Sequence, residues 1–115
     1  MPNRELENKS EIKKALEDAV ADYEQVGDGR LCGKDAANIA NLLREQGFSK
    51  MDTVKFINGP LEHYNHKLGG VVKARHHMVA ELDSTWVIDP ALKPQERVFE
   101  TFNEYLKKSG IKILT

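Results

Sequence analysis

The stretch that decides what kind of fold this chain can adopt is Val71–Leu82, the longest strand-like segment in the sequence. Successive side chains of an extended chain point to opposite faces of a sheet, and we interpret this segment as one long strand. Asp83 and Ser84 follow as a turn, Thr85–Asp89 returns as a second strand, and Pro90 ends it. The segment therefore predicts a β-hairpin, and with it an antiparallel sheet.

Helical patterns come before the hairpin. Amphipathic spacing predicts a helix over residues 9–25, and Asn8 with Glu11 forms a capping-box pattern at its start. A second helix runs on from Asp35, with Gly47 as its expected stop. The other expected elements are a strand over 53–57, a polar loop over 61–70, a loop over 91–97, a helix over 99–108, and either a short strand or an ordered tail over 111–114. This order predicts an α+β fold in which N-terminal helices pack on a small antiparallel sheet.

Composition narrows the class of protein. The 115 residues predict one domain over 1–115 with a flexible start at 1–7, and a net charge of −1 implies no strong nucleic-acid field. One cysteine excludes an internal disulfide and a cysteine-based zinc cage. His63 and His66 fall in a predicted loop without cysteine ligands, so we expect no metal and no cofactor. The sequence shows no membrane-spanning run and no signal-peptide core, which indicates a reducing compartment.

The single cysteine, Cys32, falls where a glycine-containing loop meets the second predicted helix. Backbone N–H groups without intrahelical partners and the positive end of the helix dipole gather at such a position. Both stabilise a thiolate, which is the nucleophilic form of cysteine. The position therefore suits a reactive cysteine. The other interpretation is a small apolar residue that seals the helix end.

The hairpin supplies the residue types that a cysteine nucleophile needs. Such a nucleophile requires a base within hydrogen-bond reach, and the base requires an orienting partner. His76 and His77 lie in the middle of the first strand, and Asp89 ends the neighbouring one. The two arms have similar lengths, so we expect a close approach across the hairpin. Because side chains alternate, His76 and His77 face opposite ways, and periodicity alone does not choose between them.

A family resemblance runs through these same segments. A Cys that opens a helix, then His-Met-Val-Ala-Glu-Leu and Trp-Val-Ile-Asp-Pro, resembles the papain-like and transglutaminase-like cysteine enzymes over about residues 25–92. The small size and the Cys-Gly-x-Asp-Ala-Ala helix look most like the papain-fold toxin domains of bacterial polymorphic and contact-dependent growth inhibition systems. The resemblance implies a compact papain-like fold. It also implies that Cys32 is the nucleophile, His77 the catalytic histidine and Asp89 the third member.

The resemblance also implies a function. We expect a toxin or effector domain that acts on a macromolecule by cysteine hydrolysis or acyl transfer, as a peptidase, deamidase or transglutaminase-like enzyme. The expected partner is a cognate immunity protein. The expected place of action is the cytoplasm, including that of a target bacterium after delivery within a larger secreted protein. One alternative is a ribonuclease that uses the same site on transfer RNA, with Lys55, Lys73 and Arg75 as a basic strip for phosphates. The other alternative is a non-enzymatic binding module with a structural cysteine.

Four further residues are candidates for the cleft. Papain-like peptidases carry a glutamine shortly before the nucleophile as an oxyanion donor, and Gln25, seven residues before Cys32, either serves in this way or forms the tail of the first helix. Arg30 flanks the loop before the cysteine and His76 neighbours the catalytic histidine. Trp86 either lines the cleft or packs the hairpin, as a large aromatic side chain commonly does.

Overall fold

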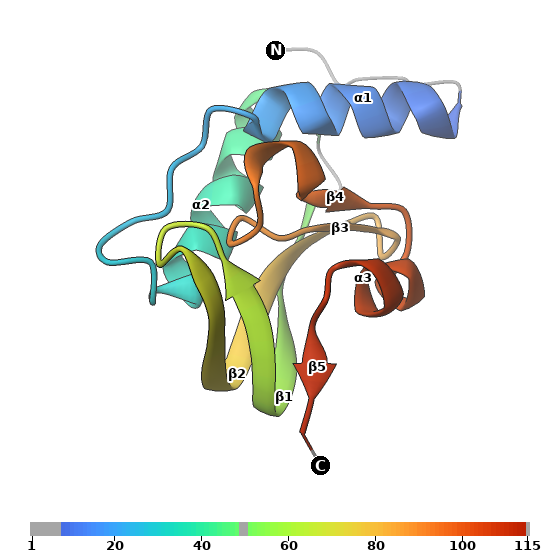
Figure 1. Cartoon of the computed structure of the whole chain (residues 1–115). Coiled ribbons are helices and arrows are strands. Elements are labelled where there is room, and N and C mark those ends of the chain that lie inside the picture. Colours follow the sequence, from blue (N-terminus) through green and yellow to red (C-terminus); the bar gives the residue numbers. More distant parts are fainter. Residues whose placement is uncertain (1–7, 49–50, 115) are drawn as a thin grey trace.

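Helices precede strands in the folded chain, as the sequence predicts (Figure 1). The structure is a computed structural model that describes residues 8–48 and 51–114, so the flexible start expected for 1–7 lies outside the described residues. The helical elements are α1 (Lys9–Val20), α2 (Cys32–Glu45), the 3-10 helix η1 (Pro94–Glu96) and α3 (Phe102–Lys108). The strands are β1 (Met51–Asn65), β2 (Gly70–Leu82), β3 (Trp86–Ile88), β4 (Val98–Phe99) and β5 (Lys112–Ile113).

The five strands form one sheet in the order β4-β3-β2-β1-β5, and every neighbouring pair is antiparallel. This confirms the α+β class with N-terminal helices on a small antiparallel sheet. The predicted hairpin is present, since Ala80 pairs with Ile88 and Leu82 with Trp86. β3 is much shorter than β2, so its chain leaves the sheet directly after Ile88. Asp89 therefore departs beside the middle of β2, which positions it for the site described below.

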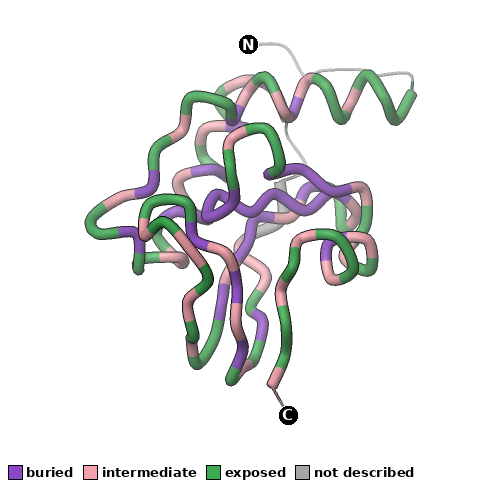
Figure 2. Tube along the Cα trace, viewed as in Figure 1, coloured by how far each residue is buried: buried purple, intermediate pink, exposed green. Residues whose placement is uncertain are grey.

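Alternate residues of β2 and β3 feed two separate hydrophobic clusters, which places the clusters on opposite faces of the sheet. Ala80 and Leu82 pack with residues of α1 and α2, whereas Val79 packs with Tyr105 of α3. Figure 2 shows the buried segments gathered along β3 and β4, while the β1–β2 hairpin alternates between buried and exposed positions. The central sheet is thus covered by helices on both faces, and β2 contributes to both clusters.

α1 ends at Val20, five residues before the predicted end of the helix. The predicted start is confirmed, because the Asn8 side chain accepts a hydrogen bond from the Glu11 N–H at 2.9 Å. The early end has a cause far along the chain. The buried guanidinium of Arg97 donates to the backbone carbonyls of Val20 (2.9 Å) and Tyr23 (2.8 Å). These bonds satisfy the carbonyls at the helix end and release residues 21–25 to form the loop.

The loop predicted over 61–70 is wrong. β1 continues through the expected break to Asn65, and Leu61 pairs with Ala74 across a bulge at Asn58–Leu61. Pro60 is tolerated at this bulge, where a missing N–H costs no ladder bond. Only the short turn between Asn65 and Gly70 lies outside the strands. His63 consequently lies on a strand and is buried.

The C-terminal prediction needs a smaller correction. Phe99 belongs to β4, and α3 begins at Phe102 because Thr101 caps it by accepting the Glu104 N–H at 3.0 Å. The short last strand is confirmed as β5, which pairs with β1 at Leu61. Across the described ranges 8–48 and 51–114, no helix has the length and apolar character needed to cross a membrane.

Candidate active site

Cys32 is the first residue of α2, as the sequence predicts. No side chain caps this helix start, because Leu31 holds the N-cap position. The Cys32 sulfur is therefore left to interact with backbone N–H groups, and those of Gly33 and Met78 both favour its charged form. Gly33 has no side chain, and a Cβ placed there would lie 2.8 Å from the Met78 sulfur. The glycine thus lets the helix start approach β2 closely enough to bring the thiol to the strand.

The structure brings His77, rather than His76, into contact with Asp89. The His77 ring nitrogen Nε2 lies 3.0 Å from the Asp89 carboxylate oxygen Oδ2, and both side chains are buried. His76 points away from Asp89, is exposed and stacks on Phe56 with ring centroids 5.1 Å apart, but it lines the cavity described below, as predicted for a cleft residue. The choice that periodicity left open is thereby made by burial and by the position of the carboxylate.

Asp89 accepts three hydrogen bonds in full burial. Besides His77, the Tyr105 hydroxyl donates to Oδ2 at 2.6 Å and the Ala91 N–H donates to Oδ1 at 2.9 Å. Burial alone would raise the pKa of Asp89, but the His77 charge and these hydrogen bonds hold that pKa below its ordinary value. Burial and the nearby carboxylate raise the pKa of Tyr105, so its hydroxyl stays a donor. Asp89 is therefore a fixed anion, held from β2, α3 and its own loop.

The thiol and the imidazole interact with each other. Because Nε2 of His77 is engaged by Asp89, Nδ1 is the ring nitrogen left for Cys32. Nδ1 is fully buried and has no hydrogen-bond partner of standard geometry among the described residues. The two side chains are nevertheless close enough to shift each other's pKa. Catalytic hydrogen bonds are commonly long in the absence of substrate.

The two shifts have the same consequence. Burial disfavours a charged His77, but Asp89 and Cys32 together raise the pKa of this histidine to about 10. Burial likewise disfavours a Cys32 thiolate, but the nearby His77 and the two backbone N–H groups lower the pKa of Cys32 below its ordinary value. Both shifts favour the combination of an imidazolium and a thiolate, and the thiolate is the form in which a cysteine is nucleophilic.

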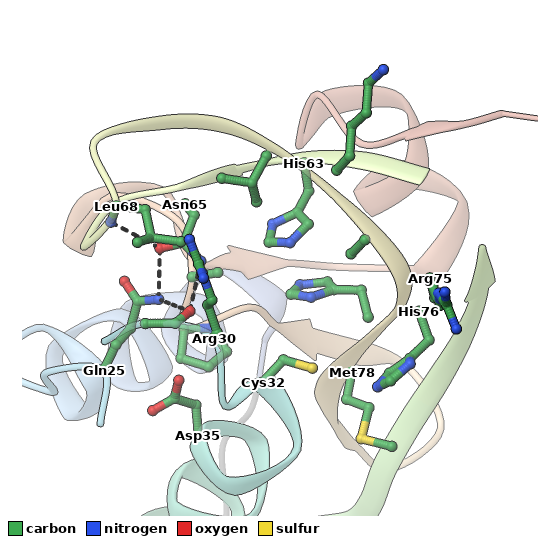
Figure 3. A pocket seen from close by; sticks show the side chains of 17 residues that line it. Gln25, Arg30, Cys32, Asp35, His63, Asn65, Leu68, Arg75, His76 and Met78 are labelled. Carbon is green, nitrogen blue, oxygen red and sulfur yellow. Dashed lines mark hydrogen bonds between the residues drawn. The ribbon is translucent and has the colours of Figure 1, made fainter. Parts of the chain in front are cut away.

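A cavity of about 580 Å³ opens at this pair and is lined by Cys32, His77, His63 and residues of the loop before α2 (Figure 3). Its rim carries Arg30, Lys73 and Arg75, all exposed, and none of the three forms an ion pair with another described residue. Figure 3 shows Arg30 and Arg75 on opposite sides of the cavity. Lys55 does not belong to this rim, because it pairs with Glu81 at 3.7 Å and lies over the Phe102 ring.

Gln25 lines the cavity, but its amide is engaged within the protein. Its Nε2 donates to Asn65 Oδ1 at 3.1 Å, and its Oε1 accepts the Lys67 N–H at 3.0 Å. Asn65 in turn donates to the Gly29 carbonyl at 2.7 Å. These bonds clamp the loop before Cys32 onto the turn of the β1–β2 hairpin, and Figure 3 draws those that join Gln25, Asn65 and Gly29. In this arrangement Gln25 holds the loop, and the backbone N–H groups at the start of α2 are the available oxyanion donors.

Trp86 does not line the cavity, which corrects one of the two interpretations given for it. Its side chain is buried in the cluster formed by α1, α2 and the sheet. Its position on β3 places it on the same face as Ile88, where both pack beneath the helices. Burial of the large apolar Trp86 side chain in this cluster stabilises the fold.

His63 and Tyr105 are residues of the site that sequence reasoning missed. His63 stacks on the His77 ring with centroids 4.0 Å apart and an interplanar angle of 26°. The signal for His63 lay in the alternation of Leu61, His63 and Asn65, which are all buried on one side of β1. That alternation is hidden in the sequence because two of the three residues are polar. Nothing in the sequence indicated that Tyr105 reaches Asp89.

Within the described ranges, no three His, Cys, Asp or Glu side chains are grouped as a metal site requires. Comparison with known proteins finds no matching family model, no matching curated protein and no matching solved structure.

Proposed function

We propose that the protein is a cysteine-dependent enzyme that transfers or hydrolyses acyl groups, with Cys32 as nucleophile. One observation carries the proposal. Nε2 of His77 is bonded to the buried Asp89, which leaves Nδ1 for Cys32 at the start of α2. This division of roles is what a cysteine–histidine–acid site requires. The papain-like architecture suggested by the sequence resemblance remains part of the proposal.

The reaction follows from these positions. The Cys32 thiolate attacks the carbonyl carbon of an amide or ester, and the oxyanion faces the free backbone N–H groups at the start of α2. The His77 imidazolium then gives its proton to the leaving group, and a thioester on Cys32 results. Asp89 keeps the ring oriented and supplies the counter-charge throughout.

The sequence resemblance gives the proposal its biological setting. We place the chain among bacterial toxin or effector domains that act in the cytoplasm of a target cell. A cognate immunity protein is then the proposed partner, and it would cover or block the cavity. Arg30 and Arg75 on its rim are exposed to solvent, so a binding protein can reach the cavity.

A second candidate function is cleavage of RNA, most directly transfer RNA. The observation that favours it is the rim of cations without ion pairs formed by Arg30, Lys73 and Arg75. Lys and Arg side chains placed in this way contact phosphates, and their contribution falls with salt concentration. The net charge of −1 makes this rim a local feature of the surface.

The deciding experiment compares substrates and variants in one series. Purified protein is incubated with casein and with total RNA, using wild type, Cys32→Ala and Cys32→Ser. Acyl chemistry predicts modified or cleaved casein with wild type only, whereas cleaved RNA with intact casein selects the ribonuclease. Expression in a bacterial host should arrest growth with wild type and not with Cys32→Ala.

The non-enzymatic alternative has its own signature. A structural cysteine reacts slowly with iodoacetamide at neutral pH. Its replacement by alanine then alters neither the cleavage of casein or RNA nor the growth of the host. That outcome would contradict the proposal.

A further inference from the structure

The stacked rings of His63 and His77 both line the cavity, and their nitrogens have different hydrogen-bond partners. His77 has one nitrogen on Asp89 and is held as the charged ring. His63, stacked on it at 4.0 Å, has its Nδ1 2.9 Å from the backbone carbonyl of Tyr64. A carbonyl oxygen only accepts hydrogen bonds, so Nδ1 of His63 carries the proton. In the neutral ring, Nε2 is then a free acceptor.

That acceptor faces the cavity. His63 is only 5% exposed, lines the cavity beside Cys32 and His77, and points into it in Figure 3. Nε2 has no hydrogen-bond partner among the described residues, yet it is not sealed off, in contrast to Nδ1 of His77. A buried histidine whose tautomer is fixed and whose lone pair faces a reaction cavity has the geometry of a general base.

From this geometry we infer that His63 is the general base of the second half of the reaction, taking a proton from the water that hydrolyses the Cys32 thioester. The inference rests on the proposed function, because it requires an acyl group on Cys32. It assigns the two histidines different tasks. His77 stabilises the Cys32 thiolate and protonates the leaving group, whereas His63 takes the proton from water.

Before this step His77, which gave its proton to the leaving group, takes another proton from solvent, so it is an imidazolium again and water is the one further reactant. The water oxygen attacks the thioester carbonyl carbon while one of its protons passes to Nε2 of His63. The tetrahedral intermediate collapses, the C–S bond breaks, and the sulfur leaves as the thiolate that His77 stabilises. The acid product departs, and His63 returns its proton to solvent.

The charges around His63 favour this task. Burial lowers the pKa of His63, and the charge on His77 lowers it further, against smaller opposing effects of the Tyr64 carbonyl and Asp89. The other titratable or charged groups that line the cavity are Cys32 and Asp35 of α2, His76 of β2, and the rim cations Arg30, Lys73 and Arg75. Two stacked imidazolium rings would repel each other, so the charge on His77 keeps His63 neutral at pH 7.

The test uses p-nitrophenyl acetate as acyl donor. Release of nitrophenol and the mass of acetyl-Cys32 follow acylation, and steady-state turnover follows deacylation. His63→Phe keeps a ring against His77 and removes both nitrogens, and His63→Asn keeps a donor for the Tyr64 carbonyl. His66→Asn is the matched control, since His66 is exposed in the turn of the same hairpin and outside the cavity.

We expect both His63 variants to acylate at about the wild-type rate and to accumulate acetyl-Cys32, with deacylation slowed about 100-fold. Wild-type deacylation should rise with pH as His63 loses its proton and then level off, and His63→Phe should lose this dependence.

Equal deacylation in wild type and both variants would overturn the inference and leave the proposed function standing. Equal loss of acylation, of deacylation and of alkylation by iodoacetamide would also overturn it, because His63 would then only support His77. No acetyl-Cys32 in wild type would remove the proposed function itself.

Discussion

Replacing Asp89 with asparagine should turn the Cys32 thiolate back into an ordinary thiol. The change removes the negative charge that keeps His77 an imidazolium, and burial then favours the neutral ring. Without that cation, burial favours the protonated thiol as well, so the pKa of Cys32 returns toward 9.0 or above. A thiol of this pKa is about 1% ionised at pH 7, so alkylation at pH 7 should slow by as much as about 100-fold.

The measurement is the rate of alkylation by iodoacetamide as a function of pH. Asp35→Asn is the matched control, because Asp35 is also buried and its Oδ1 accepts both the Tyr23 hydroxyl (2.7 Å) and the Val26 N–H (2.9 Å). An asparagine oxygen can keep both bonds, so this variant should retain the wild-type rate profile. Folding of each variant is followed by its urea unfolding curve. A folded Asp89→Asn protein that is alkylated as fast as wild type at pH 7 would refute the role assigned to the carboxylate.

Three further outcomes follow from the same contacts. Tyr105→Phe removes the 2.6 Å hydrogen bond to buried Asp89 and should lower the free energy of unfolding by about 1–3 kcal/mol, measured in urea; an unchanged midpoint would mean that Asp89 finds another donor. Arg97→Met removes the hydrogen bonds to the carbonyls of Tyr23 and Leu92 and one of the two to the Val20 carbonyl, which keeps the Tyr23 N–H at 3.2 Å, and should cost about 2 kcal/mol or more by the same measurement, with Lys9→Met as an exposed control. In a Cys32→Ala background, stability should fall as the pH rises above 6.5, because folded His77 keeps a proton that the unfolded chain releases, so the stabilisation is complete only below 6.5. His77→Gln in the same background should flatten that decline, and a decline that persists unchanged would assign it to other groups.

Local patterns predicted the elements whose stability is local. The capping box at Asn8, the start of α2 at Cys32 and the hairpin turn at Asp83–Ser84 all depend on neighbouring residues, and each is confirmed. The turn even requires positive φ at both residues, 53° each, which Asp and Ser tolerate less readily than Gly. Such features are encoded within a few residues of where they appear.

Features that depend on distant partners were not predictable in this way. α1 stops at Val20 because Arg97, far along the chain, occupies its terminal carbonyls. β1 continues past Pro60 because a bulge and the pairing with β2 compensate for the missing N–H. For the site, the residue types and their order predicted which groups would meet. The choice of His77, the Tyr105 hydrogen bond and the position of His63 each required the packed sheet.

The sulfur belongs to the helical segment that ends before residue 49, whereas its imidazole and carboxylate belong to the sheet segment after residue 50. Folding usually shields a cysteine from reagents. Here the docking of α2 on β2 brings the sulfur to His77, which lowers the pKa of the thiol. At neutral pH this thiol should therefore react faster in the native protein than in urea, and its labelling rate would report how completely the two segments have come together.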